Sequence, residues 1–207
     1  MVDRRPLRGQ CRSAREHGPA VYTPPVGPLQ FRIPEIRPAN LGDGELLDGL
    51  LAGASRYVLP GFVGPLAAPL PIRHLASLDR MLVSDGTGFI VSMGDLPLAF
   101  GAWSRRDRDP AAGTETGGAR QLVPGTDAAR ILSLAIRGDF SGKGLAAGVL
   151  DECAAAARAE GYGRLALMAV PEAVGFCVRC GFEEVRRLTV VVDGAPTDAV
   201  EMVRHLR

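Results

Sequence analysis

Residues 130–170 read RILSLAIRGDFSGKGLAAGVLDECAAAARAEGYGRLALMAV. Two apolar runs in this stretch, Ile131–Ile136 and Leu165–Val170, are typical of buried strands. The alanine-rich segment Leu145–Glu160 between them predicts a helix, and Gly161 marks its end. A strand, a helix and a second strand in this order predict a βαβ crossover.

The turn before this helix, Ser141-Gly142-Lys143-Gly144, contains the only lysine of the chain. Glycines that open a helix leave its first backbone N–H groups uncovered. Together with the positive end of the helix dipole, those groups attract anions. The turn therefore predicts a binding site for a phosphorylated small molecule, and a glycine-rich turn without a ligand is the alternative.

Two known phosphate motifs fit this turn poorly. A Walker A loop needs a glycine where Arg137 stands and a Ser or Thr where Gly144 stands. A dinucleotide-binding fingerprint matches Gly142, Gly144 and Ala147. However, that fingerprint begins almost directly after its strand, and it needs an acidic residue at the end of the next strand, where Val170 lies.

The same turn resembles the pyrophosphate loop of the GNAT superfamily of acetyl-CoA-dependent N-acetyltransferases. In the family motif R/Q-x-x-G-x-G/A, Gly144 and Ala146 match, and Ser141 departs from the usual Arg or Gln. Residues 136–140 resemble the apolar-x-P-D-aromatic stretch that precedes this motif, with glycine in place of proline. Residues 173–182 resemble the family segment A-x-x-hydrophobic-Tyr-x-x-x-Gly-Phe.

This resemblance covers residues 31–207 and implies a single α/β (α+β) domain. Its sheet would be mixed and mostly antiparallel, with helices on both faces. The two central parallel strands, Ile131–Ile136 and Leu165–Val170, would begin as neighbours and then splay apart. Residues 1–30 contain five arginines and several prolines without apolar periodicity, so we expect a disordered tail there.

The resemblance implies acetyl-CoA as co-substrate and no metal. The pantetheine arm of acetyl-CoA would lie between the splayed strands and pair with the first of them. The pyrophosphate would meet backbone N–H groups of the turn, where a Cβ on either glycine would block its approach. The implied cofactor-binding residues are Leu134, Ala135, Ile136, Ser141, Gly142, Lys143, Gly144, Leu145, Ala146 and Phe176.

The chemistry that the resemblance implies is direct attack of a primary amine on the thioester in a ternary complex. A backbone N–H near Leu134 would stabilise the oxyanion. Cys177 stands where many relatives carry a tyrosine that protonates the departing thiolate. A thiol, with an ordinary pKa of about 8.5, is a candidate general acid. A buried cysteine that packs as a small hydrophobe is the alternative.

Other chemistry-bearing residues give weaker signals. Cys177-x-x-Cys180 fits a redox or zinc pattern but lacks a second Cys or His pair nearby. Glu172 follows the second strand, where it would act as a base through water or cap the short helix. His74 is expected to be a surface or packing residue, and Phe100 and Trp103 are expected in the core or the cleft wall.

Outside the βαβ unit, periodicity and turn residues predict further segments. Asn40 is the expected cap of the first helix. A polar loop at 105–126 is either a mobile lid or disordered. In chain order, the segments are a strand at 31–36, a helix at 41–59 ended by Pro60-Gly61, an irregular connector at 64–71, a helix at 72–83, a hairpin at 88–104, this polar loop, a short helix at 172–179 and a hairpin at 188–205.

Composition narrows the class of protein. The 207 residues carry a net charge of +1, which argues against a nucleic-acid binder driven by bulk positive charge. No secretory signal and no apolar run near the roughly 20 residues of a membrane span are seen, so we expect a cytoplasmic protein with no membrane partner. The expected partner is a small-molecule or peptide amine. The acceptor would sit between the first two helices and the final hairpin, where the apolar region 58–72 suggests a small or modestly apolar acceptor. A homodimer is left open.

Two other functions stay open from the sequence. A non-catalytic acyl-CoA-binding or sensor protein of the same fold is suggested by Cys177 and Ser141, which depart from the family pattern. A nucleotide- or NAD-binding oxidoreductase is suggested by the G-x-G-x-x-A match.

Overall fold

The structure is a computed structural model, and it describes residues 33–59, 62–65, 80–107, 120–192 and 195–207. Within these residues one large sheet contains β1 (Glu35–Pro38), β2 (Ala54–Leu59), β3 (Phe62–Pro65), β4 (Gly88–Met93), β5 (Leu96–Ser104), β8 (Ala129–Arg137), β9 (Arg164–Ala169), β10 (Glu183–Val192) and β11 (Ala195–His205).

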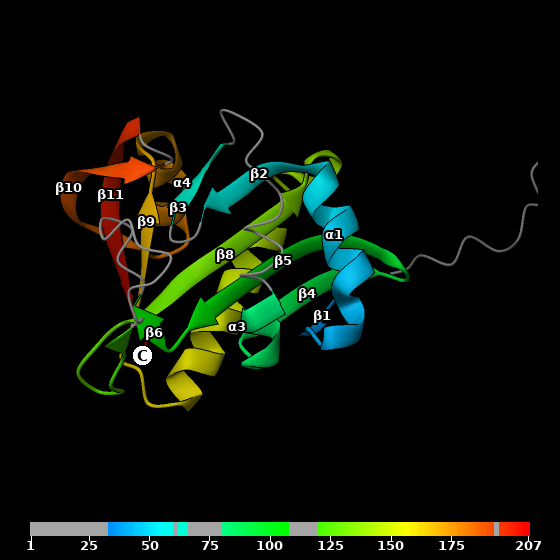
Figure 1. Ribbon diagram of the computed structural model, residues 1–207, viewed down its shortest axis with the longest axis horizontal. Helices are drawn as coiled ribbons and strands as arrows, with labels where there is room; N and C mark the ends of the chain where they lie inside the picture. The colour runs from blue at the N-terminus through cyan, green and yellow to red at the C-terminus, as the bar shows by residue number, and fades with distance from the viewer. Residues whose placement is uncertain (1–32, 60–61, 66–79, 108–119, 193–194) are drawn as a thin grey trace, which may run out of the picture. The chain divides into compact units, whose positions relative to one another are not determined.

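The strand order of this sheet is β1-β4-β5-β8-β2-β3-β9-β11-β10 (Figure 1). Most neighbouring strands are antiparallel, whereas β9 is parallel to both β8 and β3. α1 (Gly44–Gly53) packs on one face of the sheet, and α3 (Leu145–Ala159) packs on the other. The predicted α/β class, with a mixed sheet and helices on both faces, is confirmed.

The βαβ unit forms where the sequence predicts it. β8, α3 and β9 differ from the predicted segments by at most two residues at either end. α3 stops because Gly161 adopts a left-handed φ of +87°, and its N–H bonds to the carbonyl of Arg158 at 2.9 Å. Val149 and Leu150 of α3 are buried against the sheet.

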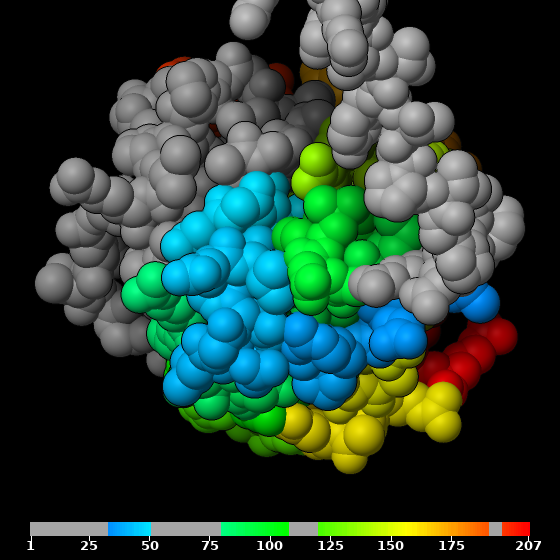
Figure 2. Space-filling view, turned by 90° about the vertical axis from the view of Figure 1, so that its right-hand side faces the viewer, coloured from blue at the N-terminus to red at the C-terminus, as the bar shows by residue number. Residues whose placement is uncertain are grey.

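The first described segment packs on both faces of the sheet. Asn40 accepts a hydrogen bond from the N–H of Gly42 and caps η1 (Leu41–Asp43), as predicted. Asp43 is buried and forms an ion pair with Arg37 of β1 at 2.6 Å. Ile36 of β1 reaches α3 on the opposite face from α1. Figure 2 shows the blue and cyan atoms of β1 and α1 beside the green β4–β5 hairpin and the yellow α3.

The helix predicted for residues 41–59 is too long. α1 ends at Gly53, and residues Ala54–Leu59 form β2, which pairs with β3 and with the end of β8. Gly53 is a poor helix former, and Tyr57 and Val58 favour strands, so tertiary pairing overrides the leucine periodicity of α1. Part of the segment predicted as an irregular connector is likewise a strand, since β3 covers Phe62–Pro65.

Four other predicted boundaries change. β1 begins at Glu35 and not at residue 31. The two ends of the polar loop pair as β6 (Arg106–Asp107) and β7 (Arg120–Gln121), and residues 108–119 lie outside the described part. Of the helix predicted at 72–83, only its end is described, where residues 80–84 are helical. The final hairpin is longer than predicted, because β10 begins at Glu183 and β11 at Ala195.

Arginine ion pairs hold the beginning of β8 to two other strands. Arg130 bonds to Asp107 of β6 at 3.2 Å and to Glu201 of β11 at 3.0 Å. Arg186 of β10 also bonds to Glu201, at 2.7 Å. Burial raises the pKa of the Glu201 carboxyl, but hydrogen bonds from Arg186 and Arg130 outweigh this effect and lower the pKa below its ordinary value.

Candidate active site

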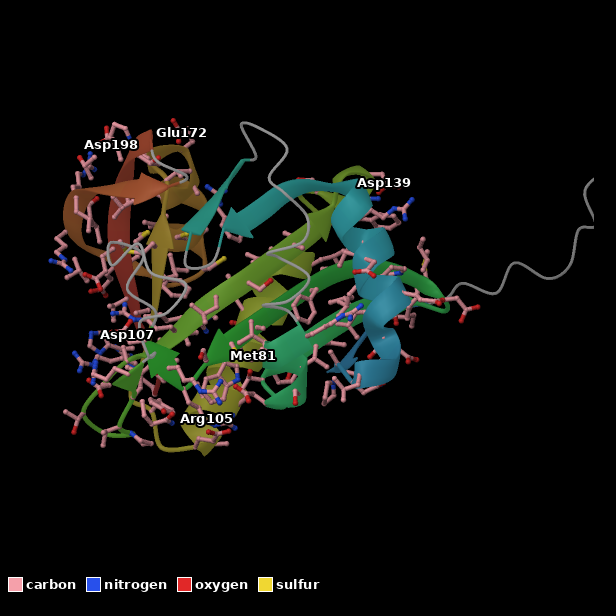
Figure 3. The ribbon with its side chains drawn as sticks, in the orientation of Figure 1. Met81, Arg105, Asp107, Asp139, Glu172 and Asp198 are labelled. Carbon is pink, nitrogen blue, oxygen red and sulfur yellow. The ribbon has the colours of Figure 1, made fainter. Side chains whose placement is uncertain are left out.

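The two central parallel strands diverge after their first residues. β8 pairs with β9 only at Ala129 with Leu165 and at Arg130 with Ala166. Beyond these pairs the strands separate, and we call the diverging region the splay, with its closed end at Arg130. The predicted splayed pair is therefore present. Figure 3 places Arg105 and Asp107 near the closed end, and Asp139 and Glu172 on opposite sides of the open end.

The other edge of β8 is paired with β5 along most of its length, but the ladder contains a bulge. Ile131 lies opposite Trp103, and Ser133 lies opposite Ala102, so Leu132 is an extra residue on β8. A bulge bends its strand and changes the direction of the following groups. Leu134 and Ile136 then lie on the α3 side of the sheet, while Leu132 and Ala135 lie on the α1 side.

The loop at the end of β8 contains two left-handed glycines. η3 (Gly138–Phe140) follows β8, and Gly142 and Gly144 then adopt φ angles of +78° and +82°. A Cβ built on either glycine meets no protein atom within 4 Å. These glycines are needed for the backbone conformation and not for internal packing, and the space beside them is open to a ligand.

The first turn of α3 offers uncovered N–H groups at this loop. Gly144 is the N-cap residue, and no side-chain hydrogen bond caps the helix. Ser141, Gly142, Lys143 and Gly144 are exposed, whereas Ala146 is buried beneath them. α3 is 15 residues long, so its dipole is well developed at this end. The loop can therefore accept an anionic group on its backbone.

Lys143 is held above an aromatic ring of the same loop. Its Nζ lies 4.4 Å from the centroid of the Phe140 ring, within the range of a cation–π contact. Beside it, Arg137 and Asp139 form an ion pair at 3.0 Å. The side chain of Lys143 thus stays at the exposed loop.

Cys177 lies in the hydrophobic core. It belongs to α4 (Val174–Arg179), is 0% exposed, and packs in the cluster that contains Val149 and Phe182. Burial, with a smaller effect of Cys180, raises the pKa of the Cys177 thiol to about 12. This environment favours the packing role over the role of proton donor. Phe176, on the same helix, is partly buried against this core.

Of the remaining candidates, two aromatic residues lie in the core. Phe100 and Trp103 of β5 are 0% and 1% exposed. Glu172 is exposed in the first turn of η4 (Pro171–Ala173), and this position leaves both of its predicted roles open. His74 lies outside the described residues.

Sequence reasoning missed a hairpin that lies inside the splay. β2 pairs with the end of β8, and β3 pairs with the end of β9, so both strands are inserted between the central pair. A signal was available, because Tyr57-Val58-Leu59 and Phe62-Val63 flank the turn dipeptide Pro60-Gly61. The hairpin changes how a ligand can reach β8.

Two other features are absent from the described segments. Among the residues whose positions are described, no group of three or more His, Cys, Asp or Glu side chains is arranged to hold a metal ion. Within the same segments, no helix has the length and apolar character needed to cross a membrane.

Sequence comparison identifies one family. The profile of the acetyltransferase (GNAT) family matches residues 69–182, more than half of the chain. This match contains β4, β5, the βαβ unit and the segment up to Phe182. No curated protein sequence matches the chain at a significant level.

Solved structures share the fold at low sequence identity. The ribosomal-protein-S18-alanine N-acetyltransferase from Escherichia coli is 16% identical, with a TM-score of 0.57 over 84% of this chain and 94% of that chain. Ard1 from Thermoplasma volcanium is 16% identical, with a TM-score of 0.58 over 84% and 98% of the two chains. An agmatine N-acetyltransferase variant is 15% identical, with a TM-score of 0.60 over 84% and 99%. At these identities the likeness shows the fold and not the acceptor.

Proposed function

The chain belongs to the GNAT family of acetyltransferases, and from this premise we propose that it transfers an acetyl group from acetyl-CoA to a primary amine of a small molecule or peptide. The amine would attack the thioester directly, in a ternary complex. The observation that carries the proposal is the glycine loop at the start of α3, which lies at the open end of the splay.

The donor site follows from this loop. Backbone N–H groups of Gly142, Lys143, Gly144, Leu145 and Ala146 would bind the pyrophosphate, with Ser141 at the start of the loop. Lys143 would add a charge-assisted contact to a phosphate. Pantetheine would run along β8 toward Leu134, and its amides would pair with backbone groups of Leu134, Ala135 and Ile136. Phe176 would flank the arm from α4.

The oxyanion contact is assigned to the backbone N–H of Leu134. Charge develops on the thioester oxygen as the amine attacks, and a fixed N–H lowers the barrier most when it points at that oxygen. The bulge at Leu132 supports this role, because bulges redirect the backbone groups that follow them.

The proton balance does not require an acid on the protein. Attack joins the amine nitrogen to the carbonyl carbon and breaks the carbon–sulfur bond. The nitrogen then loses one proton and the departing sulfur gains one, so solvent can carry that proton between them. Cys177, whose pKa of about 12 makes it a weaker acid than an ordinary thiol, is then dispensable.

We expect Cys177→Ser to keep most of the turnover number of the wild-type enzyme. A loss of kcat at unchanged KM, with a changed pH profile, would instead assign Cys177 as the proton donor. Thermal unfolding of the variant is the control for damage to the core, because Cys177 is buried.

The acceptor is left at the level of a primary amine. One structural neighbour is named for a protein alanine and another for agmatine, a small amine, so both kinds of acceptor occur on this fold. Residues 58–72, suggested by composition to face the acceptor, include the end of β2 and all of β3. The acceptor would then approach beside this hairpin.

Calorimetric titration with acetyl-CoA, with NAD and ATP as controls, tests the proposal. We expect micromolar binding of acetyl-CoA alone, about −8 kcal/mol. Release of CoA with a panel of small and peptide amines then tests catalysis. Binding without turnover on any amine would favour the sensor alternative, and binding of NAD in place of acetyl-CoA would favour the oxidoreductase.

A further inference from the structure

The β2–β3 hairpin occupies the splay in which the donor is proposed to bind. We propose that this hairpin and the pantetheine arm exclude one another, so that the hairpin has to leave the splay before acetyl-CoA takes its full position. The inference rests on the proposed function, because it concerns the path of the donor. It adds a control step that neither the family nor the loop geometry implies.

One side of the hairpin covers the end of β8. Ala54 lies opposite Arg137, and Arg56 lies opposite Ile136, in antiparallel register. β2 also contacts η3, from which the glycine loop begins. The backbone edge that the hairpin covers therefore leads directly to the proposed pyrophosphate site.

The other side of the hairpin covers the end of β9. Phe62 lies opposite Met168, and Val63 lies opposite Ala169, in parallel register. β3 contacts η4, which follows β9. In Figure 1, β2 and β3 accordingly lie between β8 and β9 at the open end. The hairpin bridges the splay from one central strand to the other.

The path of the donor crosses this bridge. A thioester near Leu134 and a pyrophosphate at residues 142–146 are joined by the pantetheine arm, which passes Ile136 and Arg137 on the β9 side of β8. β2 is paired with that same edge. One strand edge offers each N–H and carbonyl to one partner at a time, so β2 and the arm compete for it.

Unpaired strand edges explain why the hairpin occupies the splay when no donor is bound. Two diverging strands expose unpaired edges, and such edges attract other chains or leave buried polar groups without partners. The hairpin pairs with the ends of these edges, at Ile136 and Arg137 of β8 and at Met168 and Ala169 of β9, when no donor is bound. Its attachment is limited, with two residue pairs to β8, two to β9 and a register shift between Ala54 and Arg56. Few bonds need to break when the hairpin leaves.

The exchange lowers the apparent affinity for the donor. When only a fraction of molecules has an open splay, the apparent Kd equals the intrinsic Kd divided by that fraction. Protein with a weakly attached hairpin should therefore bind acetyl-CoA more tightly. Protein whose hairpin is locked in the splay should bind it more weakly.

A reversible cross-link tests the locked state. Directly opposed residues of antiparallel strands have Cα atoms about 4.5–5.5 Å apart, within the range of a disulfide. We would combine Ala54→Cys with Arg137→Cys and form the bond with oxidised glutathione. The oxidised protein should bind acetyl-CoA at least about tenfold more weakly than the same protein after reduction with dithiothreitol. Wild-type protein treated identically controls for its own cysteines.

A pair of substitutions tests the released state. Val58→Pro removes an N–H near the end of β2, opposite Val63 of β3, whereas Val58→Thr keeps both the N–H and the β-branched shape. We expect Val58→Pro to bind acetyl-CoA about threefold to tenfold more tightly than Val58→Thr. Circular dichroism and thermal unfolding confirm that both variants are folded.

The outcomes separate this inference from the proposed function. Equal affinity of the oxidised and reduced cross-linked protein would overturn the exchange and leave acetyl-CoA binding in place. Equal affinity of the two folded Val58 variants would overturn it as well. If no form of the protein, including Val58→Pro, binds acetyl-CoA, the proposed function is wrong and the inference falls with it.

Discussion

The two edges of β8 differ although they belong to the same residues. On one edge, β5 pairs with β8 from Arg130 to Ile136. On the other, β9 covers only Ala129 and Arg130, β2 covers Ile136 and Arg137, and residues 131–135 have no strand partner within the described residues. The first edge builds the sheet, and the second can accept a ligand in extended form. The proposed function depends on the part of β8 that is left unpaired.

The glycine in the paired part of the sheet and the glycines of the loop after β8 are required for different reasons. A Cβ on Gly101 of β5 would lie 2.2 Å from Cγ1 of Val149, so packing between sheet and helix excludes a side chain there. At Gly142 and Gly144 the corresponding space is open, and the left-handed backbone is what requires glycine. Substitutions on the paired side should therefore cost stability, whereas substitutions at the loop should cost binding.

The largest effect is expected for Gly144→Glu. The new carboxylate would stand in the open space beside the α3 N-terminus and repel a pyrophosphate, so acetyl-CoA affinity should fall at least about a hundredfold, or about 2.7 kcal/mol. Calorimetry measures the loss.

The matched control for this variant is Gly125→Glu. Gly125 also has a left-handed φ, of +80°, and a Cβ added to it meets no protein atom within 4 Å. The substitution introduces the same backbone strain away from the loop, so its donor affinity should match that of the wild type. Equal affinities of the two variants would contradict the phosphate-loop assignment.

Gly101→Ala should act on stability. Forcing a methyl group against Val149 in a packed core should lower the free energy of unfolding by about 1–3 kcal/mol, measured by urea titration. Gly163→Ala is the control, because its added Cβ meets no atom within 4 Å. A folded Gly101→Ala protein with unchanged stability would show that the paired side tolerates rearrangement.

Alkaline pH should destabilise the protein through two cysteines that are buried in its core. Burial raises the pKa of Cys177 to about 12, and burial also raises the pKa of Cys153, whereas unfolded thiols titrate near 8.5. Above that value the unfolded chain loses protons that the native state keeps, so stability falls as pH rises. We expect a loss of about 1 kcal/mol per buried thiol between pH 8.5 and 9.5.

Urea titrations at several pH values measure this loss. Cys177→Ala removes one of the thiols, so its stability should decline less steeply than that of the wild type over the same pH range. Parallel declines of the two proteins would mean that Cys177 titrates near its ordinary pKa in the native state.

The smallest effect is expected for Lys143→Met. Methionine keeps the contact with the Phe140 ring and removes the charge, so acetyl-CoA should bind about threefold to fivefold more weakly at low salt. The difference should shrink as salt is added. Lys143→Arg should retain the wild-type affinity. Equal affinities of the wild type and both variants would show that Lys143 does not contact the bound donor.

The predictable parts of this protein are the local ones. β8, the glycine loop, α3 and β9 follow one another within about 40 residues, and each carries its own pattern of apolar runs, glycines or alanines. The Asn40 cap is also local, because Asn40 and Gly42 are close in sequence. For these segments neighbouring residues determine the structure, so the sequence alone was sufficient.

The parts that the sequence did not predict depend on distant partners. β2 pairs with Ile136 and Arg137 far along the chain, and the leucines before it follow a helical period that extended the predicted helix too far. The bulge at Leu132 has no signal of its own, since apolar residues surround it on β8. The burial of Cys177 likewise follows from how α4 packs and not from its motif.

The closed end of the splay acts as a fixed pivot. Arg130 of β8 forms an ion pair with Glu201 of β11, the strand next to β9, so the central strands cannot part there without breaking this ion pair. An exchange of occupants at the open end must then change the angle between the strands and not their spacing at the base. The displacement is then largest at the open end, where η3 follows β8 and η4 follows β9.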